Sequence, residues 1–214
     1  KHLVEERLFV DVEDWTISGA IDVQRLEDDG SITIMDYKFT SVWAVKNPKI
    51  DWERQLNCYA YLVEAAKKVK IKELQIICFL RDWNRNNAKR DKNYPQQQII
   101  IVPIKLWDFD EQERYVIDRV KTHQEALQDY VDGKEMAECS FEEMWKREDT
   151  YAVKKKKNVR ALKVFEDEEE ARVFAKEKGE EYEVEYRRGV SVRCEDNYCK
   201  VNEWCPQYQQ VLKG

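Results

Sequence analysis

Two short runs of alternating apolar and polar residues, separated by a turn-forming cluster, constrain the fold more than any other feature. The runs cover residues 15–23 and 31–39, and Glu27-Asp28-Asp29-Gly30 lies between them. This pattern predicts an antiparallel hairpin. Asp22 lies at the end of the first run and Asp36 near the end of the second. Two carboxylates are therefore expected to converge at one end of a largely aliphatic hairpin.

Lys38 adds a positive charge two residues after Asp36. Because side chains alternate across a strand, these two residues are expected on one face and Tyr37 on the other. Charges on an apolar hairpin are costly unless they form an ion pair or bind a hydrated metal ion. Carboxylates are ligands that Mg²⁺ prefers, and the Tyr37 carbonyl would complete the coordination. The alternative is a surface hairpin with an Asp36–Lys38 ion pair.

A helix is predicted over residues 51–68, where apolar residues recur at helical spacing. It carries Gln55 and Tyr59 one turn apart, on neighbouring parts of one face. The order Gly-Ala-Ile-Asp, then Asp-Tyr-Lys, then Gln-Leu-Asn-Cys-Tyr resembles the RecB-like branch of the PD-(D/E)XK nuclease superfamily. That branch includes the nuclease domains of RecB and AddB, CRISPR-associated RecB-like exonucleases and many phage exonucleases. The resemblance covers roughly residues 15–65.

The resemblance assigns a role to each of these residues. Asp22, Asp36 and Lys38 would bind Mg²⁺ or Mn²⁺ and activate water, and Gln55 and Tyr59 would contact DNA. It also implies an α/β, restriction-endonuclease-like core with a mixed central sheet flanked by helices. The implied activity is metal-dependent hydrolysis of DNA phosphodiester bonds, by an exonuclease rather than an endonuclease, in phage or bacterial recombination and DNA processing. A catalytically incomplete DNA-binding or assembly module with the same fold is the alternative.

One part expected from the resemblance is missing near the beginning of the sequence. RecB-like nucleases supply another metal ligand, often His, from a helix upstream of the first strand. The nearby candidates are His2, Glu5 and Glu6, and the sequence begins at Lys1. The apolar run over residues 8–12 predicts a first strand that Glu5 and Glu6 precede, so His2 is expected in a solvated terminus. We therefore expect the sequence to lack an upstream segment.

A basic segment lies between two predicted strands in the middle of the chain. It spans residues 81–95, and we predict that its Arg81 and Arg85 contact a DNA backbone; a solvated loop is the alternative. The net charge of −6 argues against a general nucleic-acid binder but permits local basic patches. The neighbouring strands are predicted over residues 74–80 and 97–105, and an amphipathic helix over residues 110–132.

The composition changes near Cys139, and we divide the chain there into two domains. Residues 1–135 form the predicted nuclease core, and residues 136–214 a small α+β module rich in cysteine. Its predicted elements are strands over 151–153, 161–165 and 182–188 and a charged helix over 166–178.

Four cysteines of the C-terminal third predict a metal centre: Cys139, Cys194, Cys199 and Cys205. Four thiolates suit a structural Zn²⁺ or an iron–sulfur cluster, and free thiols are the third alternative. Several RecB-like nucleases carry a C-terminal cysteine triad that ligates a 4Fe–4S cluster, and the spacing before Cys205 is similar. In those relatives the fourth Cys precedes the nuclease motifs, whereas Cys139 follows them.

The sequence shows no apolar run long enough to span a membrane and no signal peptide. We therefore expect a cytoplasmic protein of a bacterial or phage-infected cell. The expected partners are DNA and a recombination or helicase protein, with no membrane.

Overall fold

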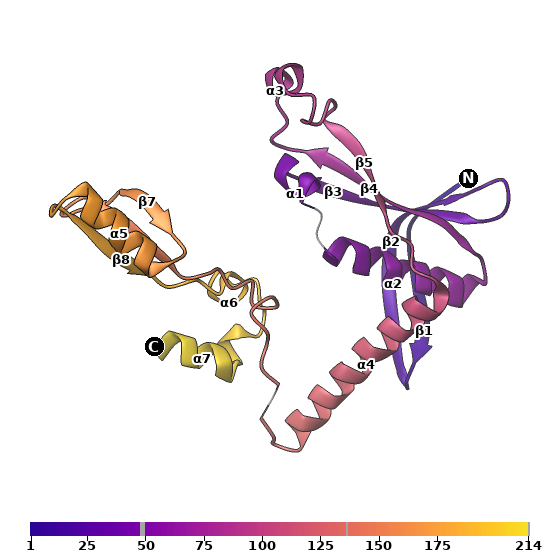
Figure 1. Ribbon diagram of the computed structural model, residues 1–214. Coiled ribbons are helices and arrows are strands. Elements are labelled where there is room, and N and C mark those ends of the chain that lie inside the picture. The colour runs from indigo at the N-terminus through magenta and orange to yellow at the C-terminus, as the bar shows by residue number, and fades with distance from the viewer. Residues whose placement is uncertain (48–49, 136, 214) are drawn as a thin grey trace. The chain divides into compact units, whose positions relative to one another are not determined.

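The computed structural model describes residues 1–47, 50–135 and 137–213, with only the backbone given for residues 211–213 (Figure 1). The chain divides into two compact units, Lys1–Lys134 and Glu135–Gly214, here called the core unit and the C-terminal unit. None of the described helices is long and apolar enough to cross a membrane.

The core unit is built on a five-stranded sheet in the order β1-β2-β3-β4-β5. Its elements are β1 (His2–Val12), β2 (Trp15–Leu26), β3 (Ile32–Thr40), α1 (Val42–Lys46), α2 (Ile50–Lys67), β4 (Ile71–Leu80), α3 (Arg85–Arg90), β5 (Ile99–Ile104) and α4 (Phe109–Val131). Only β3 and β4 pair in parallel, and the other neighbours are antiparallel. A parallel pair needs a crossover connection, which α1 and α2 provide. The sheet is therefore mixed, as the sequence predicted.

The first strand is longer than predicted. β1 begins at His2, which pairs with Arg25, so Glu5 and Glu6 lie within the strand and do not precede it. The sequence-based prediction was wrong here because the apolar run begins only at Leu8. Pairing with the long strand β2 extends β1 through polar residues that show no alternation of their own.

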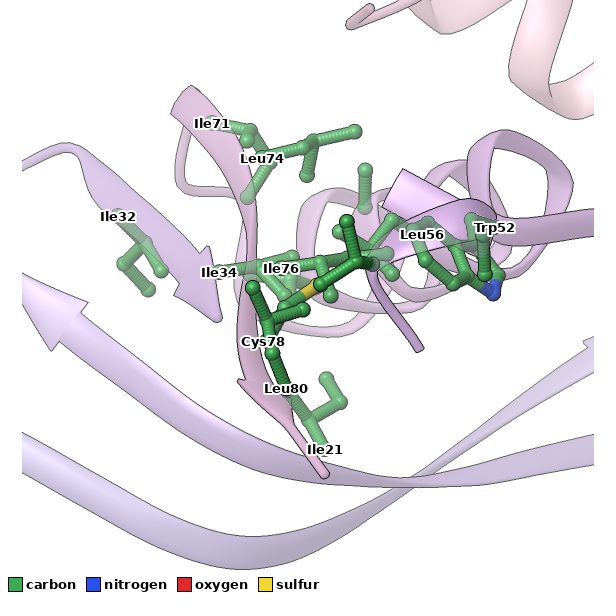
Figure 2. Packing of buried hydrophobic residues seen from close by; sticks show 14 residues of the cluster. Ile21, Ile32, Ile34, Trp52, Leu56, Ile71, Leu74, Ile76, Cys78 and Leu80 are labelled. Carbon is green, nitrogen blue, oxygen red and sulfur yellow. The ribbon is translucent and has the colours of Figure 1, made fainter. Parts of the chain in front are cut away.

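Helix α2 covers one face of the sheet and forms the main core with it. Leu56 of α2 is fully buried with Ile34 of β3 and Ile76 of β4, and Figure 2 shows these side chains gathered beside Trp52. Helix α4 packs against α2, where Val116 contacts the cluster that includes Tyr61 of α2. These contacts follow from the helical spacing of apolar residues in both segments.

The opposite face of the sheet exposes aromatic and aliphatic side chains. Phe39 is 79% exposed and stacks on Phe79, and Ile101 on β5 is 60% exposed. The described helices of the core unit leave this face uncovered at β3 and β5. The predicted mixed sheet with flanking helices is therefore found in its coarse form, with α2 on one face.

The basic segment between β4 and β5 contains the short helix α3, which sequence analysis did not predict. Asn84 caps this helix by accepting hydrogen bonds from the backbone N–H groups of Asn86 and Asn87. The Trp83 indole donates to the carbonyl of Pro95 at 2.7 Å, which joins the two ends of the segment.

The C-terminal unit contains a three-stranded antiparallel sheet in the order β7-β6-β8. Its elements are β6 (Thr150–Lys155), β7 (Ala161–Phe165), α5 (Glu168–Lys178), β8 (Tyr182–Arg187), α6 (Val192–Glu195), the 3-10 helix η1 (Asn202–Trp204) and α7 (Pro206–Lys213). Helix α5 packs on this sheet, where Ala171 and Ala175 meet Val153 and Phe165.

Candidate active site

The site begins where strands β2 and β3 separate. Their pairing runs from Leu26 opposite Ile32 to Val23 opposite Met35 and ends there. Asp22 immediately precedes Val23 on β2, and its Oδ2 accepts a hydrogen bond of 2.9 Å from the Tyr37 N–H. The Asp22 carboxylate thus takes a donor on β3 just beyond the last paired residues, where the hairpin opens.

The alternation of side chains breaks at the same place. Ile21 lies in the core beneath α2, and Gln24, three residues later, also faces α2 through a hydrogen bond with Lys67. In a regular strand, positions separated by three residues face opposite sides. Glu5, which lies in β1 between the residues paired with Val23 and Ile21, has a φ of 51°. This irregularity surrounds Asp22, and the sequence pattern did not predict it.

Asp36 is a buried carboxylate, with 3% of its surface exposed. Its Oδ2 lies 2.8 Å from the Lys38 Nζ. Beyond this ion pair, Oδ2 has no hydrogen-bond partner among the described residues. Burial raises the pKa of Asp36 above its usual value; the Lys38 ammonium partly counteracts this, and the negative charge of Asp22 raises the pKa further.

Gln55 and Tyr59 of α2 lie beside this pair, as the hydrogen bonds of Gln55 show. The Lys38 Nζ donates to the Gln55 Oε1 at 2.9 Å. The Gln55 Nε2 donates to the Asp36 Oδ1 at 3.3 Å and to the Tyr59 hydroxyl at 3.1 Å. The structure therefore brings Asp36, Lys38, Gln55 and Tyr59 into one hydrogen-bonded group.

Gly19 is a positioning residue that the sequence analysis quoted but did not interpret. A Cβ atom at this position would lie 2.8 Å from Leu62 Cδ1 and 3.0 Å from Tyr59 Cε1. Such contacts are too close for ordinary packing, so glycine lets α2 approach β2. The Gly-Ala-Ile-Asp motif therefore supplies two features: its glycine lets α2 pack closely on β2, and its aspartate is Asp22.

Arg81 and Arg85 lie outside this hydrogen-bonded group. Arg81 directly follows β4, and its N–H donates to the Thr40 carbonyl at the end of β3. Both arginines are exposed, and neither forms an ion pair within the described ranges. Since β3 and β4 are parallel, Arg81 lies at the edge of the sheet toward which β3 runs from Asp36.

The upstream candidates for a further metal ligand do not join Asp36. Glu6 accepts a hydrogen bond from Gln24 at 2.7 Å and forms an ion pair with Lys67, which lowers its pKa. His2 is exposed in β1. The described residues contain no group of three or more His, Cys, Asp or Glu able to hold a metal ion.

Two acidic side chains still suit a hydrated cation. Asp22 and Asp36 interact electrostatically, and the buried Asp36 Oδ2 has no described partner other than the Lys38 ammonium. Mg²⁺ keeps several waters and is commonly held by one or two carboxylates. The donor set therefore fits Mg²⁺ or Mn²⁺.

The four cysteines of the C-terminal unit lie within electrostatic reach of one another. Burial raises the pKa of Cys194, and the thiols of Cys199, Cys139 and Cys205 raise it further. The backbone of Cys139 exchanges two hydrogen bonds of 2.9 Å with the Gln207 side chain. All four are free thiols that do not form a ready-made group of three metal ligands in the part described.

The sequence matches the PD-(D/E)XK nuclease superfamily over residues 2–206. The chain belongs to this superfamily. Its mixed sheet and helices fit a PD-(D/E)XK core. PD-(D/E)XK nucleases generally use Mg²⁺ or Mn²⁺.

Seven chains of solved structures are also similar to this PD-(D/E)XK chain. One is described as "Crystal structure of SSO0001", with 18% sequence identity and a TM-score of 0.37 over 56% of this chain. The present chain spans half the length of that chain. No curated protein matches the sequence.

Proposed function

We propose that this chain is a RecB-like DNA nuclease that depends on Mg²⁺ or Mn²⁺ and acts as an exonuclease. The observation that carries the proposal is the buried Asp36 carboxylate beside Lys38, at the point where β2 and β3 separate at Asp22. A buried carboxylate with a raised pKa beside a lysine is a candidate for chemistry.

Each residue of the site then has a role. Asp22, Asp36 and the Tyr37 carbonyl would hold the cation, which supplies positive charge to the phosphoryl oxygen when it is bound. Lys38 would orient the attacking water, because Asp36 and Gln55 fix its ammonium group. Gln55 and Tyr59 would place the DNA, and Arg81 and Arg85 would contact its phosphates.

Activity assays with matched variants test this proposal. Purified protein is incubated with end-labelled linear DNA and with circular DNA, in Mg²⁺ or Mn²⁺. Asp36→Asn and Lys38→Gln should each abolish cleavage while leaving DNA binding largely intact, and cleavage confined to linear DNA would identify an exonuclease. Asp118→Asn on the exposed surface of α4 is the control for loss of one acidic residue. Full turnover by both site variants would contradict the proposal.

The second candidate function is a catalytically incomplete module that binds DNA or assembles with a recombination or helicase protein. The observation that favours it is the absence of a third acidic or histidine ligand near Asp36 in the described part. Calorimetry with Mn²⁺ separates the two functions. Binding that Asp36→Asn removes supports the nuclease, and no binding to the wild-type protein supports the module.

We also propose that Cys139, Cys194, Cys199 and Cys205 hold a 4Fe–4S cluster or a Zn²⁺ ion in the cytoplasm of a bacterial or phage-infected cell. Their electrostatic proximity supports this, because four soft thiol donors suit either group. Metal analysis and visible absorbance distinguish a coloured iron protein from a colourless zinc protein. Metal-free protein with an ordered C-terminal unit would contradict both assignments.

A further inference from the structure

Basic and acidic residues are sorted along the sequence of the C-terminal unit. In a chain with a net charge of −6, residues 150–165 contain six basic residues and no acidic one. The six are Lys154, Lys155, Lys156, Lys157, Arg160 and Lys163. The next segment begins with the acidic run Glu166-Asp167-Glu168-Glu169-Glu170. The basic residues all belong to the β6–β7 hairpin, which we call the basic hairpin (Figure 1).

The turn of the basic hairpin has a defined backbone. The Asn158 N–H donates to the Lys155 carbonyl at 2.9 Å, and the Lys156 N–H donates to the Glu181 carbonyl at 2.7 Å. Lys157 adopts a left-handed conformation, with a φ of 73°. These contacts attach the turn to the loop before β8, so its side chains extend from an ordered backbone.

Two of the six basic side chains have partners within the unit. Lys154 forms ion pairs with Glu183, at 3.8 Å, and with Glu185. Lys163 lies over the rings of Phe165 and Phe174. Their charges are therefore partly satisfied by the fold.

The other four basic residues are at the turn and have no such partners. Lys155, Lys156, Lys157 and Arg160 are all exposed, and they form no ion pair with any residue that the structure describes. The nearby loop includes Glu181, which contributes its backbone carbonyl to Lys156. The acidic run at residues 166–170 lies at the other end of β7, beyond Phe165.

We propose that Lys155, Lys156, Lys157 and Arg160 form a second DNA-binding surface that contacts backbone phosphates, separate from the nuclease site. This inference rests on the proposed function, which identifies the bound polyanion as DNA. Clustered cations without ion pairs repel one another in the free protein, and phosphate charges neutralise them. The counterions that the DNA releases then favour binding. Phosphate contacts of this kind position DNA without reading its sequence. The basic hairpin would thus retain DNA between cleavage events.

Salt-dependent binding of a labelled DNA duplex to the full chain tests the proposal. Fluorescence anisotropy in buffer without divalent metal gives the dissociation constant at several KCl concentrations. The K155Q/K156Q/K157Q variant should bind more weakly, by about tenfold, and its salt slope should fall by about 2 to 3, since each lost phosphate contact removes about 0.9. R160Q alone should lower the slope by about 1.

The matched control removes three lysines from the core unit. Lys70, Lys72 and Lys105 are exposed and lie at the edge of the sheet opposite the end of β3. K70Q/K72Q/K105Q should keep the wild-type slope, and circular dichroism checks that every variant is folded. An unchanged slope and affinity in both hairpin variants, or an equal loss in the control, would overturn the proposal.

A separate measurement distinguishes this result from failure of the proposed nuclease function. Cleavage that depends on Asp36, together with an unaltered salt slope in the hairpin variants, would refute the hairpin and leave the nuclease intact. If the hairpin variants have a reduced salt slope but no cleavage depends on Asp36, the nuclease function would be refuted and the DNA-binding role of the basic hairpin supported.

Discussion

Replacing Asp36 with Asn should stabilise the metal-free core unit at neutral pH. Burial of the Asp36 carboxylate outweighs the compensation from the Lys38 ammonium, as the raised pKa of Asp36 shows. Asn keeps the shape and the hydrogen-bonding capacity toward Gln55 without the buried charge. The Lys38 side chain is 27% exposed, so it can be solvated when its partner becomes neutral. We expect a gain on the order of 1 kcal/mol in the free energy of unfolding, since one pKa unit corresponds to about 1.4 kcal/mol.

The effect should depend on pH with a definite sign. Because the folded-state pKa of Asp36 is raised, the folded protein binds this proton more tightly than the unfolded chain. Its contribution to stability is therefore present below the usual carboxyl range and is lost as the pH rises through the folded-state pKa. Asp36→Asn has no such loss. The free energies of unfolding of the variant and the wild type should therefore converge in acid and diverge toward neutral pH.

Divalent metal should reverse the order of stability. A cation at the site offsets the repulsion between Asp22 and Asp36, so it should stabilise the wild type more than Asp36→Asn. At a metal concentration of about one hundred times Kd, the gain for a single site is about 2.7 kcal/mol. Hydrogen exchange in peptides from β3 and α2 measures this in the core unit, independently of the C-terminal unit. The reasoning would be refuted if Asp36→Asn were less stable than the wild type in the absence of metal, or if metal stabilised both proteins equally.

Three further predictions concern the surroundings of the site. Gly19→Ala should lower the free energy of unfolding by about 1 to 3 kcal/mol, because the added methyl group collides with Tyr59, and urea denaturation measures the loss. Gln55→Ala should weaken DNA affinity, because Gln55 would place the DNA, and should also slow cleavage, because Lys38 loses an acceptor; unchanged affinity and rate would contradict both roles. The pKa of Cys58, raised by burial to about 11, should keep its thiol unreactive toward iodoacetamide at neutral pH, and peptide mass spectrometry detects any rapid modification of the native protein.

Local sequence patterns predicted the elements that carry the site. The alternation around Asp36 and the helical spacing of Gln55 and Tyr59 are short-range properties, and the structure places both elements close to their predicted bounds. The structure also brings Gln55 and Tyr59 beside Asp36 through hydrogen bonds. The bounds of the strand and the helix depended on the period of each element, which the chain encodes locally, whereas the place of α2 beside Asp36 was implied by the family resemblance.

Features that depend on contacts between distant segments were not predictable in the same way. The separation of β2 from β3 at Asp22 and the left-handed backbone of Glu5 lie where β1, β2 and β3 pair with one another, and this pairing is not encoded in any one segment. The start of β1 at His2 depends on the length of its partner β2. No local pattern in residues 1–7 carries that information, because their apolar residues follow no strand period.

Helix α2 connects these levels of structure. The absence of a side chain at Gly19 sets its distance from β2, and the burial of Leu56 fixes its orientation over β3 and β4. With the helix fixed in this way, Gln55 can reach both Lys38 and Asp36. A change that shifts α2 should therefore disturb the ion pair without touching either charged residue, because packing in the core determines the geometry of the polar group above it.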